Sequence, residues 1–126
     1  MIKIELPFRL PSLNEYVNIC RNNKYGAGKH KKDIENRILW YLKNVKQKID
    51  KPVFVKFVWY EKTKKRDKDN VAFAKKYILD ALQKSGILPN DNNQYISGFS
   101  DYFVYGNCDK VSITLTDAPQ DATTHL

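Results

Sequence analysis

The 126 residues suffice for one domain around a single hydrophobic core, and the two cysteines, Cys20 and Cys108, lack zinc-site spacing and are too few for a disulfide framework. The 22 Lys and Arg against 14 Asp and Glu give a formal charge of +8, which favours polyanions, with nucleic acid first and an anionic membrane second. The opening segment MIKIELPFRL has neither the apolar region of a signal peptide nor the length of a membrane span, so we expect no membrane partner and a cytoplasmic protein.

The chain begins with an alternating pattern. Ile2, Ile4 and Leu6 alternate with polar residues, which predicts a half-buried strand ending near Pro7. Residues 11–30 are rich in Asn, Lys and Gly and have little periodic apolar surface, so we expect a long loop. The cations of this loop either contact a phosphate backbone or are solvated charges, and both interpretations stay open. The basic residues in and just beyond it are Arg21, Lys24, Lys29, His30, Lys31 and Lys32.

A helix and a strand are predicted next. Apolar residues at helical spacing predict an amphipathic helix over residues 31–48. Trp40 and Tyr41 flank its apolar stripe, and we expect them in the core or in an interface. The segment 53–60, VFVKFVWY, is β-branched and aromatic, which predicts a largely buried strand.

The second half predicts a further helix and two strands. Apolar spacing over residues 71–82 indicates a helix that Gly86 ends. Residues 95–105 and 111–115 have strand patterns, and residues 117–126 form a flexible tail. Taken together, the elements predict one α/β (α+β) domain over the whole chain: a small mixed sheet of about four strands with two main helices packed on it.

Two carboxylates, Asp67 and Asp69, lie one residue apart within the cationic segment KKRDKDN, residues 64–70. Helix capping is the structural interpretation, because an Asp before a helix accepts backbone N–H bonds. One Asp suffices for a cap, however, and hard divalent cations such as Mg²⁺ choose clustered carboxylates. The main candidate for a third ligand is Asp91, which would arrive over the sheet edge or from a partner subunit.

Helical phase places Asp69, Lys76 and Asp80 on the side of the second helix that faces away from the core. Asp80 is roughly 16 Å beyond Asp69 along the axis, too far to share a metal with it. Phe73 lies on the same outward side with Tyr77 near it, which favours cover by another chain or a base. The alternative is a solvated helix surface with two exposed rings.

The segments RDKDN at residues 66–70 and AKKYILDAL at residues 74–82, followed by Asp91, resemble the RusA family of Holliday-junction resolvases, which is common in prophages. The resemblance is strong over residues 62–91. It extends more weakly to PSLNEY, residues 11–16, which is similar to the family's turn after the first strand.

The resemblance implies a homodimeric crossover junction endodeoxyribonuclease of DNA recombination and repair. Such an enzyme binds four-way junctions and, with Mg²⁺ or Mn²⁺, nicks two opposing strands symmetrically. By resemblance, Asp67, Asp69 and Asp91 are the metal-binding and catalytic acids. Lys76 matches the family's essential lysine. The residues expected to bind DNA are Arg66, Lys64, Lys65, Lys68, Arg21, Lys24, Lys29 and Asn14.

The sequence departs from the family pattern at two positions. The lysine comes six or seven residues after Asp69 instead of one helical turn after it, and the position of D-A-L together with helical phase selects Lys76, with Lys75 as the fallback. Asn90 stands where many relatives carry a further Asp, which implies weaker metal binding.

Two other functions use the same residues. In a non-catalytic DNA- or RNA-binding module, Asp67 and Asp69 would only cap a helix and tune repulsion. A nuclease for branched DNA other than Holliday junctions would have the same site.

Overall fold

Four strands form one mixed sheet, in the order β1-β4-β2-β3, in the computed structural model, which describes residues 1–22, 24–89 and 92–118. Strands β2 and β3 are parallel, and β4 is antiparallel to both β1 and β2. The predicted mixed sheet of an α+β domain is thereby confirmed. The strands are β1 (Ile2–Leu6), β2 (Val53–Glu61), β3 (Ile96–Tyr105) and β4 (Lys110–Asp117).

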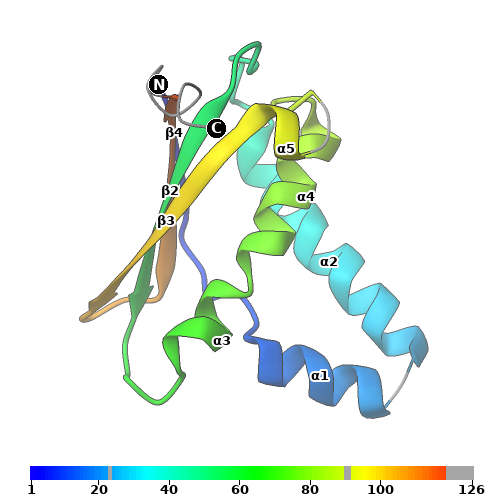
Figure 1. Cartoon of the computed structure of the whole chain (residues 1–126). Helices are drawn as coiled ribbons and strands as arrows, with labels where there is room; N and C mark the ends of the chain where they lie inside the picture. Colours follow the sequence, from blue (N-terminus) through cyan, green and yellow to red (C-terminus); the bar gives the residue numbers. More distant parts are fainter. Residues whose placement is uncertain (23, 90–91, 119–126) are drawn as a thin grey trace.

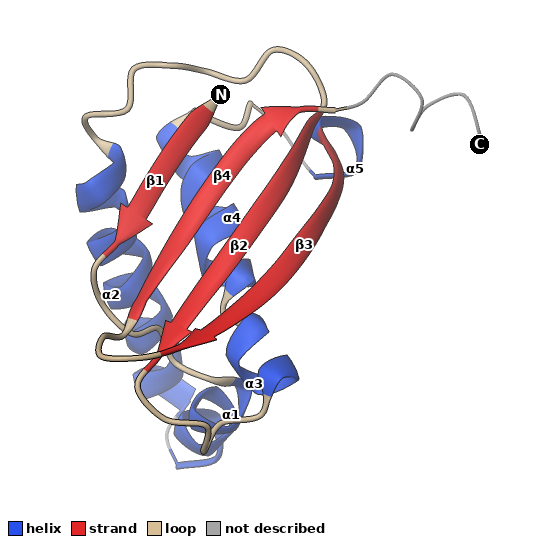
Figure 2. Ribbon diagram, turned by 90° about the vertical axis from the view of Figure 1, so that its left-hand side faces the viewer, coloured by secondary structure: helices blue, strands red, loops and turns tan. Residues whose placement is uncertain are grey.

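The described helices all lie on the same side of this sheet, with α1 and α3 beyond the end of its strands, which leaves a two-layer molecule (Figure 1). The long helices α2 and α4 contact each other and correspond to the two predicted helices. The opposite face of the sheet carries no helix in the described part of the chain (Figure 2). The helices are α1 (Leu13–Asn22), α2 (Lys24–Leu42), α3 (Lys68–Ala72), α4 (Lys75–Ser85) and α5 (Asn92–Tyr95).

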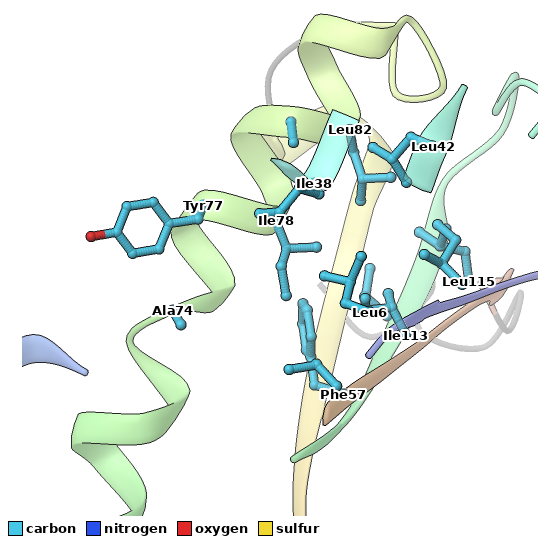
Figure 3. Close-up of a cluster of buried hydrophobic side chains, with 14 of the residues drawn as sticks. Leu6, Ile38, Leu42, Phe57, Ala74, Tyr77, Ile78, Leu82, Ile113 and Leu115 are labelled. Carbon is cyan, nitrogen blue, oxygen red and sulfur yellow. The ribbon is translucent and has the colours of Figure 1, made fainter. Parts of the chain in front are cut away.

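The core lies between the sheet and helices α2 and α4 (Figure 3). Successive side chains of a strand point to opposite faces, so every second residue of β2 faces the helices. Phe57 and Trp59 lie on that face, both almost fully buried, and their rings stack with centroids 5.6 Å apart. Ile38 of α2 and Ile78 and Leu82 of α4 belong to the same cluster of buried residues.

The prediction of a loop over residues 11–30 is wrong, because α1 and the first turns of α2 occupy most of it. Ser12 precedes α1; its Oγ accepts a hydrogen bond from the Glu15 backbone N–H at 3.3 Å and donates one to the Glu15 carboxylate at 3.3 Å. This Ser-x-x-Glu spacing is a helix-start signal in the sequence itself. The Asn and Gly content obscures it, and contacts of α1 with α2 and α3 outweigh the low intrinsic propensity.

The predicted helix over residues 31–48 is correct in its middle and wrong at both ends. Helix α2 begins earlier and ends at Leu42, whose carbonyl accepts a bond from the Val45 N–H at 3.0 Å. Ile49 is buried outside the helix, where its N–H donates to the Ile87 carbonyl at 2.8 Å. Val45 and Ile49 therefore continue the helical spacing only in the sequence, because the helix ends before them and Ile49 is buried from a non-helical segment.

Trp40 and Tyr41 do not belong to the buried core. Trp40 is 63% exposed, and the Lys43 Nζ lies 3.5 Å from the centroid of its ring. Tyr41 is 37% exposed and packs on Phe8 with ring centroids 5.6 Å apart. A place in an interface stays a prediction for both.

The predicted helix over residues 71–82 is divided into α3 and α4. The N–H groups of Ala74 and Tyr77 each donate to the carbonyl three residues earlier, at 3.1 Å, which is the tighter hydrogen bonding of a 3₁₀ turn. Gly86 ends α4 as predicted, because its φ of 83° lies in the left-handed region that favours glycine.

The prediction that Phe73 and Tyr77 face outward is wrong. Tyr77 is only 3% exposed, because α1 and α2 cover that side of α4. The rings of Tyr16 and His30 lie 6.4 and 6.5 Å from the Tyr77 ring. Phe73 is half-buried against the same group, with its centroid 5.6 Å from that of Tyr16.

The predicted tail at residues 117–126 begins too early. Strand β4 includes Asp117, and the Ala118 N–H donates to the Pro52 carbonyl at 3.0 Å. Residues 119–126 lie outside the described part of the chain. Across the described ranges, none of the helices has the length and apolar character needed to cross a membrane.

Candidate active site

Asp67 and Asp69 lie at the start of α3, where the chain leaves the end of β2 and turns back beneath the helices (Figure 1). The backbone carbonyls of both residues accept helical bonds, from the Val71 N–H at 3.0 Å and the Phe73 N–H at 3.2 Å. Both residues are exposed. Within residues 1–22, 24–89 and 92–118, neither carboxylate group makes a hydrogen bond or an ion pair.

The capping interpretation of Asp67 is only half correct. The residue occupies the N-cap position of α3 with an extended backbone, φ −65° and ψ 149°. Its side chain makes no capping hydrogen bond. The carboxylate is therefore available for another ligand, and a hard cation is the kind of ligand that exposed carboxylates suit.

Arg66 ties the turn before α3 to the rest of the fold. Its guanidinium donates to both carboxylate oxygens of Glu61 at 2.8 Å, to the Leu10 carbonyl at 3.0 Å and to Glu15 at 3.1 Å. The Arg66 side chain is only 14% exposed. Burial alone lowers the pKa of Arg66, but the hydrogen bonds and charges of Glu61 and Glu15 outweigh it and raise the pKa.

The sequence interpretation missed the acidic partners of Arg66, which hold it in place. Glu61 continues the inward-facing series of β2 that contains Phe57 and Trp59, so the alternation alone placed a carboxylate on the buried face. Glu15 is the last residue of the Ser-x-x-Glu signal. The DNA contact of Arg66 stays a prediction, and its observed role is to hold this turn.

Cations surround the carboxylate pair. Lys64, Lys65 and Lys68 are exposed. The Nζ of Lys64 lies 5.3 Å from the ring centroid of Tyr105, and that of Lys68 lies 5.7 Å from the same centroid. These aromatic contacts direct two of the cations toward the end of β3 and leave Asp67 in a positive environment that attracts phosphate.

The structure separates the two candidate lysines of α4. The Lys75 Nζ pairs with Asp101 of β3 at 2.5 Å and lies 4.1 Å from the Phe99 ring centroid. Asp101 also accepts a bond from the Trp59 indole N–H at 2.9 Å. Lys76 is exposed and lines a pocket between α4 and α1. Of the two lysines, Lys75 is engaged in an ion pair, whereas Lys76 makes none with the described residues. The catalytic role of Lys76 stays a prediction.

The predicted DNA-binding residues of the first loop belong to helices instead. Asn14 and Arg21 are exposed in the first and last turns of α1, and Lys29 is exposed on α2. Lys24 begins α2, and its side chain lies outside the described part of the structure. We call residues 62–69, which lead into α3 and carry Asp67 and Asp69, the carboxylate turn. Because α1 contacts α3, Asn14 and Arg21 belong to the helix beside this turn.

The third predicted ligand, Asp91, lies outside the described residues, as does Asn90. The described neighbours Pro89 and Asn92 follow the C-terminal end of α4, whereas Asp67 and Asp69 precede its N-terminal end (Figure 1). The described residues contain no group of three His, Cys, Asp or Glu side chains that would hold a metal ion. Asp67 and Asp69 fit a divalent ion by their exposure and chemistry, as a site with two ligands from this end of the fold.

Comparison with models of known protein families gives no match, and a search of curated proteins gives none either.

Proposed function

We propose that the protein is a metal-dependent endodeoxyribonuclease that selects branched DNA and resolves Holliday junctions by paired symmetric nicks. The observation that carries the proposal is a pair of exposed carboxylates, Asp67 and Asp69, that have no partner among the described residues; they lie at the start of α3, directly after a cationic turn held by Arg66. Helix capping does not account for the Asp67 side chain. The resemblance of residues 62–91 to the RusA family supplies the substrate class.

In this proposal each described side chain has a distinct role. Asp67 and Asp69 hold the Mg²⁺ or Mn²⁺ ion, which when bound would lower the pKa of an attacking water and stabilise the leaving 3′-oxygen. Lys76 offsets the negative charge that grows on the phosphate in the transition state. Lys64, Lys65 and Lys68 bind the DNA backbone, so affinity falls as salt rises.

The homodimer completes the site. Because the described neighbours of Asp91 lie at the other end of α4, whose 11 residues rise about 16 Å, we propose that a partner protomer supplies this third carboxylate. Two equivalent sites then face the two strands that a symmetric junction presents. The proposed setting is the cytoplasm, where DNA recombination and repair supply such junctions.

The N-terminal helices extend the proposed DNA surface. Asn14 and Arg21 on α1 and Lys24 and Lys29 at the start of α2 would contact phosphates away from the cut. Arg66 contributes by positioning the turn, and any direct DNA contact would need its guanidinium to leave Glu61 or Glu15.

Asp67→Asn tests the proposed metal site. With a labelled four-way junction and Mg²⁺, we expect paired nicks from the native protein and a loss of cleavage of at least about a hundredfold from the variant, with junction binding retained. Asn caps a helix about as well as Asp, so the free energy of unfolding stays within about 0.5 kcal/mol. Asp33→Asn, an equal charge change at an exposed position of α2, is the matched control and keeps full cleavage.

Junction binding without nicks from the native protein, at several metal ions and pH values, would contradict the nuclease and favour a non-catalytic binding module. A panel of flaps, forks and four-way junctions identifies the preferred branch. Faster cleavage of flaps than of four-way junctions would replace the junction-resolving activity by a nuclease for other branched DNA.

A further inference from the structure

A pocket of about 280 Å³ lies beside the carboxylate turn, between α1, α2 and α4. We call it the aromatic pocket; its lining residues are Tyr16, Lys31, Phe73, Lys76 and Tyr77. The backbone connects it to the proposed active site, because the Phe73 N–H donates to the Asp69 carbonyl at 3.2 Å.

Three rings form the apolar wall of the aromatic pocket. The Phe73 and Tyr16 centroids are 5.6 Å apart at an interplanar angle of 37°, and Tyr77 meets both rings nearly edge-on, at 6.0 and 6.4 Å. Tyr16 and Phe73 are only half-buried. Half-buried rings at the wall of an open pocket offer a stacking surface to a planar ligand.

One residue of the pocket lining carries a buried polar group that has no partner among the described residues. Tyr77 is only 3% exposed, and its buried hydroxyl makes no hydrogen bond within the described ranges of the chain. The His30 ring lies 6.5 Å from that of Tyr77, behind the pocket lining, and its Nε2 is also buried without a hydrogen-bond partner among the described residues. In Figure 3 the Tyr77 ring extends away from Ile78 and Phe57.

Buried polar groups almost always have hydrogen-bond partners, and leaving one without a partner is unfavourable. Such a group on a lining residue, the Tyr77 hydroxyl, indicates a ligand with a hydrogen-bonding edge. Stacking rings and an unpaired polar group together match a nucleobase, which has a flat π surface and donors and acceptors on its edge.

Two cations lie at the pocket. Lys76 is exposed, and the Lys31 Nζ is 3.6 Å from Asp80, in a pair whose side chains are 42% and 32% exposed. Such an exposed pair is weak and leaves the lysine able to exchange partners. A base in the pocket would therefore have cations available for the phosphates on either side of it.

We propose that the aromatic pocket binds an unstacked nucleobase of the DNA strand at a branch point, next to the carboxylate turn. The inference rests on the proposed function, because it takes branched DNA as the substrate. A base at a branch is easier to remove from its stack than a base within a duplex, so the pocket selects branches by their low unstacking energy. Lys31 and Lys76 then bind the flanking phosphates.

Photocrosslinking tests the location. A four-way junction carries 5-iododeoxyuridine at one crossover position at a time, the complex is irradiated in the absence of metal, and crosslinked peptides are identified by mass spectrometry. We expect the label to join a peptide that contains Tyr16, Phe73 or Tyr77. Crosslinks confined to other peptides, from every crossover position, would overturn the proposal while leaving the nuclease intact.

The same probe separates failure of the pocket from failure of the proposed function. If the native protein neither binds nor cuts junctions, the label is placed in a single-stranded oligonucleotide. A crosslink to the pocket peptides then supports base binding by the pocket, and only the proposed junction-resolving function is rejected. Absence of that crosslink overturns the pocket as well.

Matched variants test the contribution of the rings to affinity. Tyr16→Leu keeps apolar bulk but removes the stacking surface, and we expect junction affinity to fall roughly 5- to 150-fold. Tyr16→Phe keeps the ring and stays within about twofold of the native affinity. Tyr102→Leu removes a ring that is 53% exposed on the helix-free face of the sheet and leaves affinity unchanged.

A junction with an abasic site at the crosslinked position completes the comparison. The native protein should lose affinity on this junction, whereas Tyr16→Leu should lose no more than it has already lost, because both changes remove the same stacking contact. Independent, additive losses, or native-like binding by Tyr16→Leu, would overturn the proposal. Urea unfolding of each variant confirms that the fold is retained before binding is compared.

Discussion

The helix-covered face of the sheet and the turn before α3 are stabilised by different forces. The sheet face buries Phe57 and Trp59 against α2 and α4, by apolar contact that has little directionality. The turn of residues 62–67 is exposed except at Arg66, whose guanidinium holds it through carboxylate oxygens at 2.8 to 3.1 Å. Packing therefore sets the overall stability, and a directional charge network sets where the candidate catalytic carboxylates lie.

The two regions respond differently to substitution. A change in the apolar layer alters stability through volume, and its effect reaches the whole molecule. A change in the Arg66 network also leaves a carboxylate without a partner, which is a larger penalty than the loss of the ion pair itself. The following substitutions separate the two regions, in order of decreasing effect.

Phe57→Ala is expected to have the largest effect on the apolar layer. The residue is fully buried and stacks on Trp59, so the cavity left behind should lower the free energy of unfolding by about 3–5 kcal/mol in urea titrations. Tyr102→Ala, on the helix-free face, is the control and should lose less than about 1 kcal/mol. Equal losses for both would contradict the two-layer arrangement.

Arg66→Met is expected to lower the free energy of unfolding by about 3 kcal/mol, because Glu61, with a side chain only 8% exposed, keeps its charge without a partner. The double variant Arg66→Met with Glu61→Leu should recover most of this loss, since apolar pairs often replace buried ion pairs without penalty. Arg9→Met, which removes an exposed pair with Glu15, is the control and should change stability little.

The same double variant also tests the predicted DNA contact of Arg66. If Arg66 only positions the turn, junction affinity returns together with stability. If affinity stays low while stability returns, Arg66 contacts DNA directly.

Tyr77→Phe tests whether burial of the Tyr77 hydroxyl makes the stability of the protein depend on pH in the alkaline range. Burial, with smaller effects of the charges of Tyr16 and other neighbours, raises the pKa of Tyr77 from 10.0 to about 12. The contribution of the protonated Tyr77 to the free energy of unfolding is present in full below pH 10. It is lost as the pH rises toward 12, because the unfolded chain releases the phenol proton at a lower pH than the folded chain does. The native protein should lose about 2 kcal/mol more than Tyr77→Phe between pH 9 and 12, measured by urea unfolding. Parallel pH profiles for the two proteins would contradict this prediction.

Ser12→Ala is expected to have the smallest effect, about 1 kcal/mol, because it removes the hydroxyl that accepts the Glu15 N–H at the start of α1. Ser12→Gly should lose less than Ser12→Ala, since glycine is tolerated at an N-cap. A native-like melting temperature for Ser12→Ala would show that packing against α2 and α3 alone stabilises α1.

Local pattern accounted for most of the fold. Alternation at Ile2, Ile4 and Leu6, the β-branched run over residues 53–60 and the glycine at residue 86 predicted β1, β2 and the end of α4. These signals work because strand faces and helix ends depend on neighbouring residues. The missed helix α1 carries Leu13, Tyr16, Val17 and Cys20 at helical spacing, but this spacing and the Ser-x-x-Glu signal compete with an Asn- and Gly-rich composition over residues 11–30 that favours turns.

The sequence alone determined the chemistry of the candidate site: two carboxylates one residue apart, within a basic segment and beside a helix that carries Lys75 and Lys76. The tertiary structure decided which partners these groups have. Arg66 meets the Leu10 carbonyl and Glu15, 56 and 51 positions away along the chain, and Lys75 meets Asp101, 26 positions away. Tyr77 is buried because α1 covers it. Contacts of this kind depend on how layers pack, which short-range periodicity does not encode, so only the folded chain separates residues that hold the fold from exposed residues that are available to a ligand.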